Sequence, residues 1–145
     1  MDKSNISKHL YNDTVEQAVR FVESIKTEEE LGIYAYNYNW DNGFDVPKAI
    51  LKNGNCSLSI ALMVFHASDG ILFLQDKETE DGTAAWKEFI SNLYEGILAG
   101  KFSSGKLSFD PQLSKVQEYR IKKSLDEKEW IFITSIAGID CCESL

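Results

Sequence analysis

Apolar residues recur at helical spacing over most of the chain. Five of them between residues 15 and 25 fall on one helical face, which predicts a helix capped by Asp13. A second apolar stripe follows Thr27, and Thr27 and Glu30 have the spacing of a capping box, in which the two side chains satisfy free backbone N–H groups. The first third of the chain is therefore predicted to be helical.

The same pattern continues toward the C-terminus. Residues 58–65 are apolar at nearly every position, which predicts a central helix buried on several sides. Thr83 opens a longer helix whose apolar face extends to Leu98. Asp110 followed by Pro111 is typical of a helix start, because proline is tolerated in the first helical turn.

Two short apolar segments, residues 71–74 and 130–136, leave strand and helix open, since periodicity cannot decide at that length. The chain has only two prolines and shows no repeat or proline-rich linker. We therefore predict a mainly α fold, in which residues 1–145 form one compact domain of five or six helices with at most minor β content.

The charge of the chain narrows the classes of partner. There are 23 acidic and 15 basic residues, giving a net charge of −8. A negative surface repels phosphate groups, so binding to nucleic acid or to an anionic membrane is disfavoured, whereas a basic protein is attracted. A moderate negative charge also serves solubility, so it does not identify a partner by itself.

The cysteines and the apolar runs indicate the cellular compartment in which the protein is expected. Cys56, Cys141 and Cys142 form no paired framework, which favours a reducing environment. The longest apolar run, residues 60–65, is far shorter than the roughly 20 residues of a membrane helix, and residues 1–10 lack the apolar stretch of a signal peptide. We expect a soluble cytoplasmic protein.

One block of the sequence is more distinctive than the rest. Residues 37–50 read NYNWDNGFDVPKAI, and Asn53, Asn55-Cys56, Ala61-Leu62 and the Ala-Ser-Asp-Gly of residues 67–70 follow. Over about residues 31–74 the chain resembles a bacterial domain of unknown function, the family numbered 4274. That family reads roughly Asn-x-Asn-Trp-Asp-x-Gly-Phe, then Pro, then Asn-x-Asn-Cys, and ends in Ala-x-Asp-Gly.

The resemblance implies a helical fold and a bacterial origin, and it implies no activity. The chain departs from the family pattern at Gly54, Ile60 and His66, where the family has proline, a small hydroxyl residue and another aromatic. The block itself has a structural interpretation, because Trp40 and Phe44 flank a tight turn and can pack over it to join two helices.

Candidate catalytic chemistry is sparse. Nucleophilic catalysis requires a nucleophile, a base and an orienting group within reach of one another, and Cys56, His66 and Asp69 are the best combination available. No cationic neighbour in the sequence lowers the pKa of Cys56. We therefore predict no catalytic residue, no metal and no cofactor, with a Cys/His hydrolase as the less favoured alternative.

Acidic clusters are the remaining surface signal, at residues 28–30, 76–81 and 126–129. The middle cluster lies in a loop that helix packing does not explain, and loops often carry recognition. The sequence predicts these partner-binding residues: Asp76, Glu78, Glu80, Asp81, Asp126, Glu127 and Glu129.

A small acidic bacterial domain without a catalytic centre has the profile of an immunity protein of the antitoxin type. Such a protein neutralises a cognate toxin by occluding it, and a basic nuclease is the toxin class that an acidic surface suits best. The alternative is a generic scaffold or regulatory module that docks through exposed aromatic residues such as Trp86 or Trp130.

Overall fold

The computed structural model describes residues 2–145, which form eight α-helices and two 3-10 helices. These are α1 (Lys3–Asn12), α2 (Val15–Ser24), α3 (Glu28–Asn37), η1 (Trp40–Asn42), α4 (Asp45–Lys52), α5 (Leu58–Ala67), α6 (Gly70–Gln75), α7 (Ala84–Leu98), α8 (Lys115–Lys122) and η2 (Glu127–Ile133). The prediction of a mainly helical domain is confirmed. The predicted count of five or six helices is too low, chiefly because the polar α1 and the short α6 carry little periodic signal.

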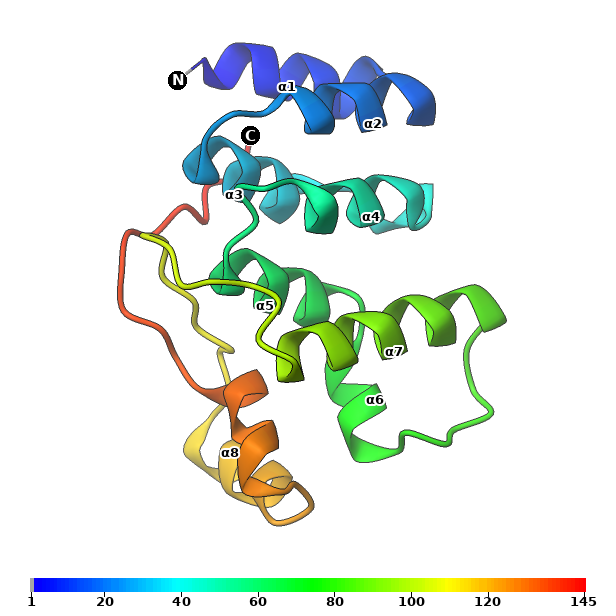
Figure 1. Ribbon diagram of the computed structural model, residues 1–145, viewed down its shortest axis with the longest axis vertical. Helices are drawn as coiled ribbons and strands as arrows, with labels where there is room; N and C mark the ends of the chain where they lie inside the picture. Colours follow the sequence, from blue (N-terminus) through cyan, green and yellow to red (C-terminus); the bar gives the residue numbers. More distant parts are fainter. Residues whose placement is uncertain (1) are drawn as a thin grey trace.

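The helices stack in layers (Figure 1). The pairs α1 with α2, α3 with α4, and α5 with α7 follow one another down the molecule, and contacts of α1 with α3, α3 with α5, and α2 with α4 join successive layers. Each layer thus buries its apolar face against the next, as in repeat proteins. The chain beyond α7 returns along one side of this stack.

Hydroxyl side chains begin most of the helices. Thr27, Ser57 and Thr83 each accept a hydrogen bond from the backbone N–H three residues later, which confirms the predicted starts of α3 and α7. The predicted cap at Asp13 is wrong, because Thr14 caps α2 in a full capping box. Asp13 instead contacts Nδ1 of His9 at 2.7 Å.

The C-terminal segments differ more from expectation. Asp110-Pro111 does not begin a helix, because Gln112 lies in the left-handed region with φ 54° and accordingly breaks the turn. Helix α8 begins instead after Ser114, which caps it. Residues 71–74 lie in α6, and most of residues 130–136 lie in the 3-10 helix η2. Pairing within residues 2–145 is limited to two isolated bridges, Leu107 with Ile139 and Phe109 with Ile136, which agrees with the prediction of at most minor β content.

The distinctive block at residues 37–50 joins α3 to α4. The Trp40 ring contacts the rings of Tyr38, Phe44 and Phe89 at centroid distances of 5.3, 6.3 and 6.2 Å. The Tyr38 hydroxyl donates to the carbonyl of Gly43 at 2.7 Å, and Gly43 has the positive φ of 86° that the turn requires. The expected packing of Trp40 and Phe44 over the turn is therefore confirmed.

The two asparagines that follow α4 tie it to α2. The Asn53 amide donates to the carbonyls of Val22 and Ile25 at 2.8 and 3.1 Å, and the Asn55 amide also reaches Ile25. These bonds reach carbonyls at the end of α2, where the Val22 carbonyl also accepts the backbone N–H of Ile25 at 3.1 Å. The Asn-x-Asn part of the motif is thus accounted for by helix packing.

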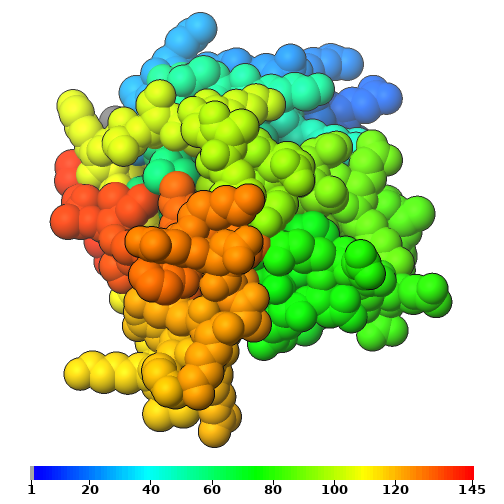
Figure 2. Space-filling model, turned by 60° about the horizontal axis from the view of Figure 1, so that its bottom comes forward, coloured from blue at the N-terminus to red at the C-terminus, as the bar shows by residue number. Residues whose placement is uncertain are grey.

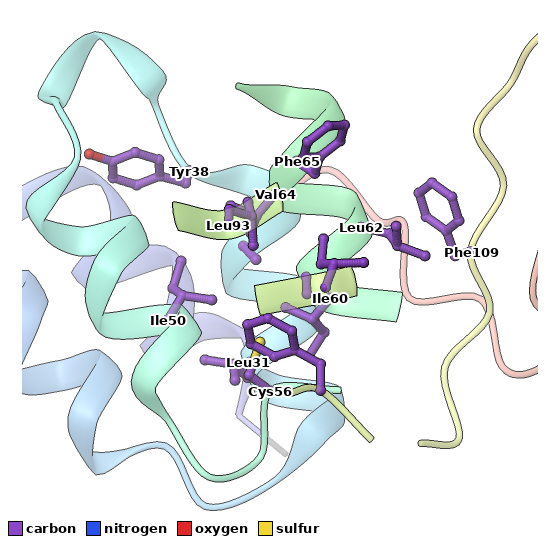
Figure 3. Close-up of a cluster of buried hydrophobic side chains, with 14 of the residues drawn as sticks. Leu31, Tyr38, Ile50, Cys56, Ile60, Leu62, Val64, Phe65, Leu93 and Phe109 are labelled. Atoms are coloured by element: carbon purple, nitrogen blue, oxygen red, sulfur yellow. The ribbon is translucent and has the colours of Figure 1, made fainter. Parts of the chain in front are cut away.

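Side chains from four helices converge in the core that Figure 3 shows around Leu31, Ile50, Ile60 and Leu93. Helix α5 lies at its centre, with Leu62 directed toward Phe109 of the returning chain. Because α5 is surrounded, most of its residues are buried, as the unbroken apolar run predicted.

The returning chain is fastened to the stack at both of its ends. The Glu28 carboxylate, at the start of α3, accepts the backbone N–H of Lys106 at 2.8 Å. The Asn37 side chain, at the end of α3, donates to the carbonyl of Glu143 at 2.7 Å and accepts the N–H of Leu145 at 3.0 Å. Helix α3 therefore holds the returning chain near residue 106 and again at residues 143–145.

We predict that Gly70→Ala lowers the free energy of unfolding by about 2 kcal/mol, because overpacking a filled core forces neighbours to move. A Cβ at Gly70 would lie 2.2 Å from the Phe65 ring and 2.6 Å from its carbonyl oxygen. The matched control is Gly54→Ala, which meets no atom within 4 Å and has no positive φ, and we expect it to be neutral. Urea unfolding of both variants checks this, and equal effects would contradict the packing argument.

Candidate functional site

The two acidic segments singled out in the sequence meet at one buried carboxylate, that of Glu129. Its side chain accepts hydrogen bonds from the Tyr94 hydroxyl at 2.7 Å, from Lys77 Nζ at 2.8 Å and from the backbone N–H of Asp126 at 3.0 Å. Lys77 belongs to the loop between α6 and α7, and Asp126 precedes η2. One carboxylate therefore joins residues 76–81 to residues 126–129.

Glu129 itself cannot serve as the predicted partner contact, because it is only 3% exposed. Removing a carboxylate from water is costly unless hydrogen bonds and an opposite charge compensate it, and all three partners of Glu129 do so. Its inclusion among the surface residues is therefore corrected. The sequence offered one clue, since Glu129 stands three residues after Asp126 at capping-box spacing.

The electrostatics of this buried group are consistent with an ionised Glu129. Burial acts to raise the pKa of Glu129, but hydrogen bonds from Lys77, the Asp126 backbone and Tyr94 outweigh it, so the pKa lies below its ordinary value. Burial and the Glu129 carboxylate raise the pKa of Tyr94, which keeps its hydroxyl protonated as a donor. Lys77 also lies over the Tyr94 ring, 5.6 Å from its centroid.

The other predicted acidic residues are exposed, and they lie on the two segments that this buried group joins. We call them the acidic face: Asp76, Glu78, Glu80, Asp81, Asp126 and Glu127. Figure 2 shows the green segment around residues 70–80 side by side with the orange segment around residues 120–130. Within residues 2–145 none of the six forms an ion pair, so their charges face solvent uncompensated.

The acidic face accounts for much of the net charge. Residues 76–81 and 126–129 contain seven carboxylates and two lysines, which contribute −5 of the total −8. The loop is also ordered: the Asp76 carboxylate accepts the N–H of Glu78, and the Thr79 hydroxyl accepts the N–H of Asp81, both at 3.1 Å. The charges of residues 76–81 are thus carried by a loop whose backbone is held by hydrogen bonds.

The hypothetical Cys56, His66 and Asp69 centre is not assembled. Cys56 precedes α5 and His66 lies in its last turn, so at about 1.5 Å per residue the two lie on the order of 12–15 Å apart along the helix. Burial raises the pKa of Cys56 to about 12, which keeps the thiol protonated. His66 is occupied elsewhere, since its Nε2–H donates to the Phe132 carbonyl at 2.6 Å.

A cavity beside His66 does bring a cysteine and two aspartates close to this histidine. This cavity of about 690 Å³ is lined by His66, Asp110, Asp140 and Cys142 among others. Burial and the Asp140 carboxylate raise the pKa of Cys142, so its thiol is not activated, and no hydrogen bond links His66 to these side chains. This cavity gathers the residue types of a reactive centre without the contacts that chemistry requires.

The two aromatic residues considered for docking are not equivalent. Trp86 is half-buried, and its indole N–H donates to the carbonyl of Ser68 at 2.7 Å. Trp130 is exposed and lies beneath Lys122, whose Nζ is 5.1 Å from the ring centroid. Two further exposed apolar side chains, Val116 and Tyr119, lie on the neighbouring helix α8.

No group of three or more His, Cys, Asp and Glu side chains is arranged to hold a metal ion within residues 2–145. In the same range, every helix is too short or too polar to cross a membrane.

Comparison with known proteins gave one match. The profile of the family described as Domain of unknown function (DUF4274) matches residues 26–98, just over half of the chain. No curated protein and no solved structure matched. The matched range contains the helical stack from α3 to α7 and the loop carrying Asp76 to Asp81, and it excludes Asp126 and Glu127.

We predict that Glu129→Gln lowers the free energy of unfolding at pH 7 by about 3 kcal/mol, because it breaks a buried, hydrogen-bonded ion pair. The pKa of Glu129 is lowered in the folded state, so its contribution is present above the unfolded pKa, ~4.3, and is lost as the pH falls through the folded value. The difference between wild type and variant should therefore shrink in urea unfolding at pH 3.

Glu127→Gln is the matched control, since Glu127 is exposed and two residues away. We expect it to change the free energy of unfolding by less than about 0.5 kcal/mol at either pH. A Glu129→Gln effect that equals this control, or that grows at low pH, would contradict the role given to the buried carboxylate.

Proposed function

From the premise that the chain belongs to the family described as Domain of unknown function (DUF4274), which carries no assigned activity, we propose a binding function. The protein is an immunity protein of the antitoxin type that occludes a basic protein toxin through its acidic face. The observation that carries this proposal is that one buried ion pair joins two segments, distant in the sequence, which together expose six carboxylates without an ion-pair partner.

The buried ion pair makes the acidic face a fixed surface. Lys77 is the basic residue of the loop, and it is engaged with Glu129 instead of neutralising its acidic neighbours. The loop is anchored by Lys77 near its start and by Thr83, which caps α7, at its end. Because the backbone that carries the carboxylates is held at both ends of the loop, less conformational freedom is lost on binding, which favours affinity.

A surface of this kind suits a toxin whose working site is positive. Complementary charge accelerates association, and fast capture is what neutralisation of a toxin requires. Nuclease sites are positive because they bind phosphate, so a nuclease is the toxin class that fits the charge best. A cytoplasmic location would place the protein where such a toxin acts.

A scaffold or regulatory module is the second candidate function. Val116, Tyr119 and Trp130 are 58%, 62% and 37% exposed, and they lie on the neighbouring elements α8 and η2. Exposed apolar groups of this kind are typical of docking surfaces. Replacing the three with serine separates the candidates, because it would abolish scaffold binding and leave charge-driven toxin binding intact.

The test is co-expression with the product of the reading frame immediately upstream, followed by measurement of growth and of binding kinetics. We expect the wild-type protein to restore growth. In the variant Asp76→Asn/Glu78→Gln/Glu80→Gln/Asp81→Asn we expect the association rate to fall at least about tenfold at low salt, because electrostatic steering is lost.

The matched control is Glu16→Gln/Glu23→Gln/Asp41→Asn/Asp45→Asn, which removes the same charge from four exposed positions in the α2, η1 and α4 region. We expect it to bind almost as fast as wild type. An equal fall in the association rate of both variants would mean that net charge, and not the acidic face, attracts the toxin. Absence of growth protection together with absence of binding would refute the proposal.

A further inference from the structure

Next to the acidic face lies a small pocket between α6 and the start of α7. It has a volume of about 330 Å³, and its walls include Asp69, Leu72, Asp76, Asp81 and Trp86. Binding pockets for small molecules span roughly 300–1,000 Å³, so this one is at the lower limit and suits a single long side chain. Two of its carboxylates, Asp76 and Asp81, belong to the acidic face.

The apolar part of the pocket is held in place before any partner arrives. The Trp86 indole N–H is fixed on the Ser68 carbonyl at 2.7 Å. The ring also lies close against Gly82, where a Cβ would stand 2.7 Å from ring atom Cε3 and where φ is 85°. Glycine at this position therefore lets the loop pack directly on the indole.

Leu72 completes the apolar wall. It is 56% exposed, although it lies on a helix whose Phe73 and Leu74 are buried. An exposed leucine beside an ordered tryptophan can cover the methylene stem of a long side chain, while carboxylates at the rim receive its charged end. The pocket thus combines an apolar floor with negative groups that have no ion-pair partner within residues 2–145.

We propose that this pocket receives an arginine side chain of the basic partner and is the anchor of the acidic face. Arginine fits better than lysine because its planar guanidinium can stack on the indole and has five N–H donors for carboxylates on different sides. The inference rests on the proposed function, since it names the chemistry by which the partner is held. Buried arginines are common among the few residues that dominate binding energy.

The experiment is an NMR titration of the full chain with Nα-acetyl-arginine methylamide. The three tryptophans give three indole N–H signals, so Trp86 can be followed separately from Trp40 and Trp130. We expect a saturable shift of the Trp86 indole and of the amides of Leu72, Asp76 and Asp81. The uncharged citrulline derivative should bind at least about tenfold more weakly, because it lacks the charge.

Two variants of equal charge change locate the binding. Asp69→Asn/Asp81→Asn should weaken binding of the arginine derivative at least about fivefold, whereas Asp126→Asn/Glu127→Gln, outside the pocket, should change it less than about twofold. Asparagine tolerates the left-handed conformation of Asp69, φ 62°, and thermal melts of both variants confirm that they fold.

Several results would overturn the proposal: equal weakening by the two variants, shifts confined to another surface, or a lysine derivative that binds as tightly as the arginine one. These outcomes are separable from the proposed function. A toxin that still binds the acidic face while the titration fails would refute the arginine pocket alone, and a successful titration without any toxin would refute the immunity role alone.

Discussion

The buried carboxylate of Glu129 is the constraint on which the C-terminal third of the chain depends. It is compensated only if Tyr94 of α7, Lys77 of the α6–α7 loop and the start of η2 meet at one point. Phe132 completes the same junction, because its ring stacks on Tyr94 at 5.2 Å and lies 4.6 Å from that of Phe65. A misplaced η2 would leave a charge unpaired in the interior, so the position of this segment is strongly specified.

The acidic face is a composite of two parts of the chain. Asp76 to Asp81 lie within the range that the family profile matches, whereas Asp126 and Glu127 lie beyond it. The later segment reaches its place through contacts along its whole length: the Glu28 carboxylate with the N–H of Lys106, the Ser59 hydroxyl with the carbonyl of Leu107, and His66 with the carbonyl of Phe132. The full face exists only when both parts are folded together, so its charge density is a property of the tertiary structure.

The sequence predicted what local chemistry determines. The helix starts at Thr27 and Thr83 and the buried character of α5 follow from capping residues and apolar runs, which act within a few residues. The predictions failed where contacts between residues far apart in the sequence determine the local structure. Asp110-Pro111 has the local signature of a helix start, yet the extended pairing of Phe109 with Ile136 governs that segment. Glu129 looked like one more surface acid, because nothing near it in the sequence names Tyr94 and Lys77 as its partners. The exposure of the other six acidic residues agrees with the prediction, whereas the ion pair that joins their two segments was not predicted.

The arrangement of charge is the strongest argument that this surface has a use. Six like charges on neighbouring segments repel one another, and a fold selected for stability alone gains by spreading them or by pairing them with lysines. Here the lysine of the loop is directed inward to Glu129, so it rigidifies the surface without neutralising it. Local destabilisation maintained by a well-determined surrounding structure is typical of functional sites. Binding of the proposed cationic partner would relieve this repulsion, so a repulsion that destabilises the free protein would contribute to the stability of the complex.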